Sequence, residues 1–246
     1  MQKLPDATTL TPDQLIERWT VWLKETQHES HHLYSSRESF ENVQRMFKSN
    51  SDLCHKGSFV LDWIWEGFKT DYLISIRREM EKGGGFLTLV NFLIELERYS
   101  EPVLTRDRYV ALYDVSPITG DFLANRHFSE KRGAMCLFPR RDKSSDCISS
   151  DSIKRLRDDL QSRTKKVVQF ANWFIAHRTR QKPLQLKIGE MYLAVDEIFD
   201  VYAYVYNLIT AGVWAERFPV AQYNWFAPFK LVWITDTFEP FKPKKK

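Results

Sequence analysis

Residues 169–181 read QFANWFIAHRTRQ, an aromatic run that ends in one histidine followed by two arginines. The histidine is His177, and Arg178 and Arg180 stand beside it. An imidazole can take up or release a proton near neutral pH, and a guanidinium can hold a phosphate. A histidine with arginines at the end of a helix is therefore suited to cleaving an RNA phosphodiester, in which one group moves a proton and another stabilises charge.

His177 also has a purely structural interpretation. On a helical wheel with 3.6 residues per turn, it shares a face with Phe170, Phe174 and Lys166, so it can lie at the edge of an apolar stripe as a hydrogen-bonded residue. Its position in the last turn before Pro183 favours a protonated imidazole through the helix dipole, whereas the neighbouring arginines oppose that protonation. Both interpretations stay open at this point.

Positive charge collects around this motif. The chain has a net charge of +4, but residues 1–125 carry 14 Lys and Arg against 19 Asp and Glu, a net of −5. Residues 126–182 carry 15 against 6, a net of +9, and residues 183–246 carry 7 against 7. A basic region on a nearly neutral protein points to an anionic partner such as nucleic acid. The alternative is a solvated helix face followed by a basic loop.

Other sequence patterns that carry chemistry are missing. Gly83 to Gly85 are not followed by the lysine of a phosphate-binding loop, and no serine stands in a nucleophile-elbow context. The histidines and cysteines do not fall at zinc-binding spacings, so we expect neither a metal nor another cofactor. Three scattered cysteines, no apolar leader and no 20-residue apolar run predict a cytoplasmic protein that does not enter a membrane.

Helices are predicted to position the motif. Only 9 glycines and 10 prolines in 246 residues favour long helices over a β-sandwich or barrel, and a chain of this length can bury a sizeable core. Apolar spacing and cap residues predict helices over residues 12–26, 31–47, 57–81, 86–99, 105–113, 151–181 and 184–210. Thr11 with Pro12, and Ser150 or Asp151, mark two of the starts, and Gly83 to Gly85 and Gly212 mark two of the ends.

Two segments depart from this helical pattern. Residues 114–150 hold turn residues and charge without periodicity, and they are predicted to form a long basic loop. Residues 213–246 are rich in Trp, Phe and Pro, and they are predicted to pack on the helices as extended or short elements. The predicted fold is therefore all-α: one domain over residues 1–246, built as a helical bundle with an insertion and a C-terminal extension.

The motif and its neighbours resemble a known family. The stretch FANWFIAHRTR, followed by a spacer and the helix IGEMYLAVDEIFDVYAYVYNLITAG, is similar to the HEPN domains of prokaryotes. The likeness is greatest to the AbiU-like branch, which is named after abortive phage infection. The segment DYLISIRREMEKGGGFLTLVNFLIEL resembles the first half of that branch. The likeness spans roughly residues 57–212 and implies a HEPN-like bundle that commonly dimerises and often acts as a metal-independent endoribonuclease.

The resemblance also implies roles for single residues. The family motif has an arginine six positions before the histidine and a polar residue next to that arginine. Here the histidine is His177 and the polar residue is Asn172, but Ala171 takes the place of the arginine. His177 would act as general acid or base, Arg178 would help to hold the phosphate, and Asn172 would orient a group from a partner chain. The further RNA- or phosphate-binding residues predicted are Lys166, Arg180, Arg140 and Arg141.

A homodimer is predicted from geometry as well. On a straight α-helix, Asn172 and His177 point about 140° apart, so they cannot face one small substrate from one chain. They can meet across a two-fold axis, or Asn172 is structural. The motif helix also has more apolar surface than one core stripe needs. This predicts that the motif helices of two chains lie near the two-fold axis of the dimer, unless the C-terminal tail covers that surface. The surface belongs to Phe170, Trp173 and Phe174.

Three functions follow from these patterns. The first is a HEPN-like protein of phage-defence or toxin–antitoxin type, which cleaves or binds RNA and has an antitoxin or regulatory protein as a further partner. The second is a catalytically silent HEPN-like module that binds a nucleotide, an RNA or a protein, as Ala171 would suggest. The third is a structural helical protein whose basic stretch is solvated surface.

Overall fold

The computed structural model of the chain describes residues 7–49, 58–83, 87–114, 147–176 and 185–211. These residues form helices and no strand, which confirms the all-α class for the described part of the chain. None of its helices is both long and apolar enough to cross a membrane. In chain order the elements are η1 (Ala7–Thr9), α1 (Pro12–Ser49), α3 (Ser58–Glu79), α4 (Leu89–Val103), α5 (Arg106–Asp114), α7 (Ser150–Ala171), η3 (Asn172–Ala176) and α8 (Ile188–Thr210).

One continuous helix, α1, replaces the two helices predicted for residues 12–47. Thr11 and Gln14 cap its start by exchanging hydrogen bonds of 2.9 and 3.3 Å between side chain and backbone. The predicted break near residues 27–30 is wrong, because the polar residues there do not interrupt the helix. Thr26 and Ser30 donate their hydroxyls to carbonyls within the same helix, at 3.0 Å from Trp22 and 2.9 Å from Gln27.

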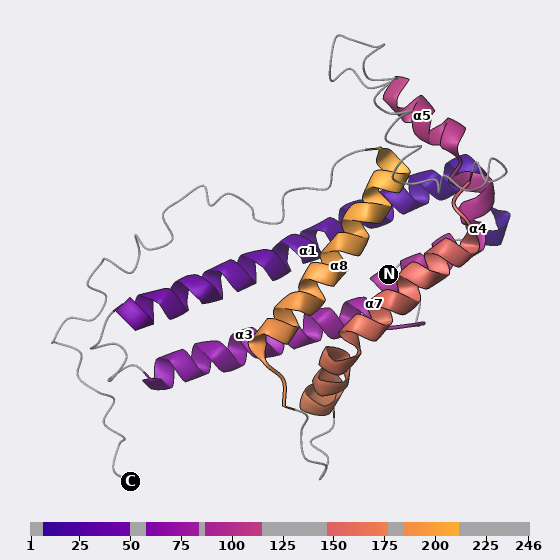
Figure 1. The fold of residues 1–246 in the computed structure, drawn as a ribbon. Helices are drawn as coiled ribbons and strands as arrows, with labels where there is room; N and C mark the ends of the chain where they lie inside the picture. Colours follow the sequence, from indigo (N-terminus) through magenta and orange to yellow (C-terminus); the bar gives the residue numbers. More distant parts are fainter. Residues whose placement is uncertain (1–6, 50–57, 84–86, 115–146, 177–184, 212–246) are drawn as a thin grey trace, which may run out of the picture.

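The bundle core lies where α1, α3, α4, α7 and α8 meet (Figure 1). In the described part of the chain, α7 packs against both α4 and α8, and α1 packs against α3 and α8. Aromatic side chains fill much of this core: Trp19, Tyr72, Phe92 and Tyr202 are almost completely buried. Burying such large side chains is the main favourable contribution to folding a bundle of this kind.

A buried carboxylate joins three helices. Glu79, the last residue of α3, is 3% exposed. Its Oε2 accepts hydrogen bonds from the backbone N–H of Leu89 at 3.0 Å and from the hydroxyl of Tyr202 at 2.6 Å. Burial raises the pKa of Glu79, although these two hydrogen bonds oppose the shift. Glu79 therefore links the end of α3 to the start of α4 and to α8.

The turn after α3 depends on a glycine. Gly83 has φ +87°, in the left-handed region, and its backbone exchanges hydrogen bonds of 2.9 and 3.1 Å with the side chain of Asn91. Glycines were predicted to end this helix, and α3 ends four residues before Gly83, at Glu79. Thr88 then caps α4 by accepting a hydrogen bond from the N–H of Asn91 at 3.2 Å.

Two helix boundaries near the motif differ from those predicted. The N-cap of α7 is Ser149, whereas Ser150 or Asp151 was expected, and its hydroxyl accepts from the N–H of Ser152 at 3.2 Å. Helix α8 begins at Ile188 rather than at residue 184. Helix α8 ends at Thr210, and its C-cap residue Ala211 adopts the left-handed conformation with φ 53°. The left-handed residue thus lies one position before Gly212, which was predicted to end the helix.

Candidate functional site

The motif helix ends in a π-helical turn. Helix α7 is α-helical through Ala171, and residues 172–176 then form η3, directly before the motif histidine in sequence. Asn172 is exposed at the start of this turn. The angle of about 140° expected between Asn172 and the histidine assumed a straight α-helix, so it does not apply to this backbone. Single π-turns inside helices are rare and are frequently found at functional sites.

Most of the predicted site lies outside the described residues. These residues are His177, Arg178, Arg180, Arg140 and Arg141. The structure therefore places only Asn172 and Lys166 of the predicted set, at the end and in the last two turns of the motif helix.

Lys166 forms an ion pair with α8. Its Nζ donates to Oε1 of Glu190 at 2.5 Å, and Oε2 of Glu190 accepts from the backbone N–H of Lys187 at 2.8 Å. The hydrogen bond from Lys166, followed by that from Lys187, lowers the pKa of Glu190. Glu190 thus both caps α8 and holds the ammonium, and its negative charge opposes the approach of a phosphate to Lys166.

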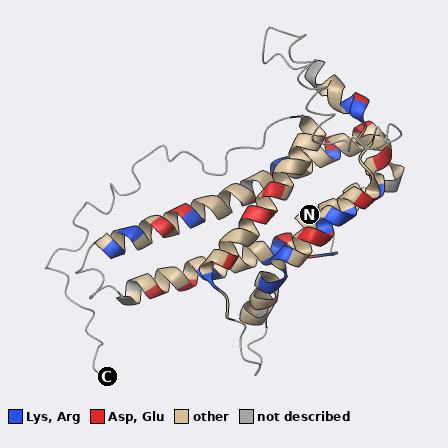
Figure 2. Ribbon diagram, viewed as in Figure 1, with Lys and Arg blue, Asp and Glu red and all other residues tan. Residues whose placement is uncertain are grey.

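Two arginines of α7 also pair with carboxylates of neighbouring helices. Arg157 contacts Glu97 of α4, and Arg163 donates to Glu197 of α8 at 2.7 Å. Figure 2 shows basic and acidic residues interleaved where α7 meets its neighbours. These ion pairs favour the alternative that the sequence left open for α7, a solvated helix face whose positive charges are partly balanced by carboxylates, over a nucleic-acid surface.

The excess positive charge lies in the flanking sequence. Residues 147–176 carry six Lys and Arg against three Asp and Glu, a net of +3, and three glutamates of α4 and α8 pair with three of those cations. Of the total of +9 in residues 126–182, the remaining +6 belongs to residues 126–146 and 177–182 together. The predicted contacts to phosphate therefore depend mainly on these two stretches.

The three aromatic residues that motivated a dimer are half-buried within one chain. The ring of Phe170 stacks on Phe174 with centroids 5.9 Å apart, and it lies 5.7 Å from Trp173. Lys69 of α3 covers the Phe174 ring at 4.8 Å. Much of the apolar surface expected at a two-fold axis is thus covered by α3 and α7, and the dimer stays a prediction that this surface does not support.

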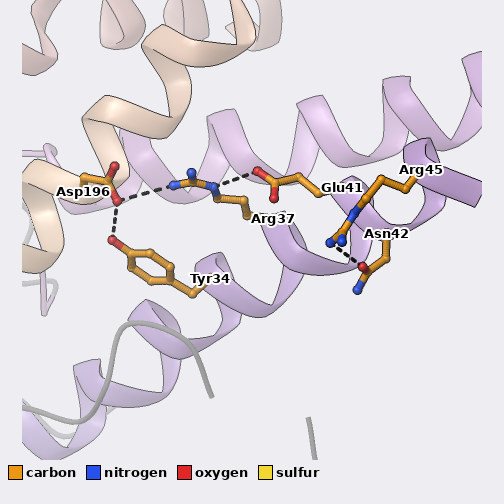
Figure 3. Close-up of polar contacts among 6 residues, drawn as sticks. All are labelled: Tyr34, Arg37, Glu41, Asn42, Arg45 and Asp196. Carbon is orange, nitrogen blue, oxygen red and sulfur yellow. Dashed lines mark hydrogen bonds and ion pairs between the residues drawn. The ribbon is translucent and has the colours of Figure 1, made fainter. Parts of the chain in front are cut away.

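Sequence reasoning did not find the polar cluster between α1 and α8 (Figure 3). Asp196 of α8 accepts from the hydroxyl of Tyr34 at 2.6 Å and lies 3.4 Å from Arg37. Arg37 also pairs with Glu41 at 3.1 Å, and its guanidinium lies 4.2 Å from the ring centroid of Tyr192. Only the spacing of Arg37 and Glu41, four residues apart on one helix, could have been read from the sequence.

This cluster joins helices rather than carrying acid–base chemistry. Burial raises the pKa of Tyr192 to about 12 and raises that of the neighbouring Tyr72 further. Both phenols therefore stay protonated at neutral pH and cannot accept a proton from a substrate. Arg37 is likewise always charged, so its guanidinium cannot accept a proton either.

Replacing Asp196 with alanine should lower the free energy of unfolding by about 1–3 kcal/mol, because it removes the acceptor of a buried hydroxyl and a carboxylate beside Arg37. Urea unfolding followed by circular dichroism measures this change. Asp196→Asn is the matched control, since its amide oxygen can still accept from Tyr34 and the loss should be smaller. Equal stability of the alanine variant and the wild type would contradict a joining role.

A histidine–carboxylate pair lies at the surface between α1 and α3. Nε2 of His32 is 3.1 Å from Asp71, and both side chains are about half exposed. A carboxylate and a histidine are two of the three members of a hydrolytic triad, but no serine of the described residues is hydrogen-bonded to His32. The described residues also contain no group of three or more His, Cys, Asp or Glu that could hold a metal ion.

No family model matches this chain, and no curated protein or solved structure matches it either. The resemblance to HEPN domains therefore stays a prediction from the residues of the motif and of the helices around it.

Proposed function

We propose that this protein is a HEPN-like protein of the phage-defence or toxin–antitoxin type and that it cleaves RNA without a metal. The observation that carries the proposal is the position of Asn172. It is exposed on a π-turn that leads in sequence directly into His177, with Arg178 and Arg180 after it. The all-α packing of the described residues and the basic sequence on both sides of α7 support the same function.

The proposed chemistry needs few groups. His177 moves the proton at the 2′-hydroxyl or at the leaving oxygen, and Arg178 and Arg180 hold the phosphate. Asn172 of one copy orients a group of a second copy in a homodimer. Because Ala171 replaces the motif arginine, the charge that develops on the phosphate must be stabilised by these arginines or by Lys166 after it leaves Glu190.

A second function is favoured by two specific observations. Ala171 removes the cation of the motif, and Lys166, the nearest described substitute, is held by Glu190. A catalytically silent module that binds an RNA, a nucleotide or a protein would keep the basic sequence and lose the cleavage. The two functions predict different outcomes of the same experiment.

The test is incubation of the full chain with total RNA in the presence of a chelator, together with RNA retention measured at increasing salt. Cleavage of the RNA is the expected result. Arg178→Ala should weaken retention and lower the salt slope by about 0.7–0.9, the value for one phosphate contact. Salt-dependent retention without cleavage would assign the silent module, and the absence of both would leave a structural protein.

A further inference from the structure

The ends of α1 and α3 form an arm with an apolar surface. Residues 35–49 of α1 and 58–71 of α3, here called the α1–α3 arm, lie side by side and extend past the start of α8 (Figure 1). On this arm Phe59 is 79% exposed and Trp63 is 71% exposed. The two residues are four apart on α3, so they lie on the same face of the helix. Two adjacent aromatic side chains exposed to this degree indicate a surface that binds something.

A groove runs along the arm. It has a volume of 490 Å³, and Phe40 and Val43 of α1 and Ile64 and Phe68 of α3 line it together with polar residues. The rings of Phe40 and Phe68 are stacked, with centroids 4.3 Å apart. A second hollow of 360 Å³ shares Phe40 and extends to Ile188 at the start of α8. The arm therefore offers apolar recesses next to the exposed aromatic residues.

A glycine opens the backbone at this groove. Gly67 lines it in the middle of α3, where glycine costs about 1 kcal/mol relative to alanine. A Cβ atom at Gly67 would meet nothing within 4 Å among the described residues, so their packing does not require a glycine. A bare backbone on an open groove allows another segment to approach closely.

The C-terminal sequence has the composition of such a segment. Residues 218–234, FPVAQYNWFAPFKLVWI, contain six aromatic residues and a single charged one, Lys230. Leaving so much apolar surface in water is unfavourable, at about 25 cal/mol for each Å². Pro219 and Pro228 disfavour a helix and suit an extended chain, which can lie in a groove between two helices.

The chain is long enough to reach the arm. Helix α8 has 23 residues and is about 35 Å long, and its first residue, Ile188, lies at the second hollow. The C-terminal sequence leaves α8 at the opposite end, after Ala211. The 14 residues from Ala211 to Trp225 span up to about 46 Å when extended, so Trp225 and the residues after it can reach the groove.

We propose that residues 218–234 dock on the α1–α3 arm of the same chain. Their aromatic side chains enter the groove against Phe40 and Phe68, the backbone passes over Gly67, and Phe59 and Trp63 are covered. This docking covers the exposed apolar surface of the arm with the apolar side chains of residues 218–234, and it needs no second copy of the chain.

The test places the photo-crosslinking residue p-benzoylphenylalanine at position 63 of the full chain. Irradiation should give a crosslink within one chain to residues 218–234, identified by mass spectrometry. The control is the same substitution at Val21, which is 52% exposed but lies on the other half of α1, and it should not crosslink to these residues. A crosslink between two chains, or no crosslink at position 63, would overturn the proposal.

Two variants of Gly67 sharpen the test in the chain labelled at position 63. Gly67→Glu puts a carboxylate into the groove and should lower the yield of the crosslink at least about tenfold, because burying a charge without a partner is unfavourable. Gly67→Ala adds a methyl group and should keep most of the yield. Both residues favour a helix more than glycine does, so α3 is preserved. Equal yields in the two variants would contradict docking over Gly67.

Discussion

Replacing His177 with alanine should lower RNA cleavage by a factor of about 10² or more, the usual effect of losing a group that transfers a proton. The rate is measured on RNA in the presence of a chelator, and circular dichroism checks that the helical fold is kept. The expected loss is large because we assign no other proton-transferring group to the cleavage.

The matched control is His55→Ala, a histidine outside the motif, which should leave cleavage unchanged. Toxicity in cells gives a second readout, since a variant that cannot cleave RNA should not arrest growth. Cleavage by His177→Ala at the wild-type rate would instead make this histidine a structural residue, as its place beside Phe170 and Phe174 on the helical wheel allows.

Replacing Glu79 with alanine should be the most destabilising change among the polar residues of the bundle. Leu89 and Tyr202 both donate to Oε2 of Glu79, so the variant removes the acceptor of two buried donors and leaves a cavity. Losing the acceptor of a buried donor costs about 1–3 kcal/mol, which gives a total loss of several kcal/mol. Urea unfolding at neutral pH measures it.

Glu79→Gln separates the hydrogen bonds from the charge. Its amide oxygen can accept from both donors, so it should be far more stable than the alanine variant. Burial raises the pKa of Glu79 above its ordinary value of 4.5, so the folded state binds the proton more tightly than the unfolded state does. The free energy of unfolding gained from this tighter proton binding is fully present below pH 4.5. It is lost as the pH rises through the raised pKa of the folded state.

The wild type should therefore lose free energy of unfolding relative to Glu79→Gln as the pH rises from 4 to 8. Unfolding curves of the two proteins at several pH values give the difference directly. Curves that stay parallel over this range would show that Glu79 keeps an ordinary pKa in the folded protein.

Local signals in the sequence predicted most of the helices. Thr11 with Pro12 marked the start of α1 correctly because a cap is set by neighbouring residues. Helix α5, expected over residues 105–113, begins at Arg106. The break expected near residue 28 was wrong because hydroxyl groups of α1 bond to its own carbonyls, and the sequence has no glycine or proline there. The π-turn at Asn172 had no recognisable signal in the sequence.

The candidate site was less predictable because its contacts join distant residues. Glu190 lies 24 residues after Lys166, and Asp196 lies 159 residues after Arg37, so neither ion pair could be read from spacing along a helix. A cation that looks available to a phosphate in the sequence can thus be held by a carboxylate of another helix. Charge counted along the chain showed where positive residues gather but not which of them are paired.

The continuity of α1 has a mechanical consequence. Its 38 residues make a rod about 57 Å long. Near one end Arg18 pairs with Glu95 of α4 at 2.7 Å, and where the arm begins Arg37 lies 3.4 Å from Asp196 of α8. Because α1 has no glycine, and no proline after Pro12, that could act as a hinge, we expect a displacement of the arm to be transmitted along the helix to its contact with α4.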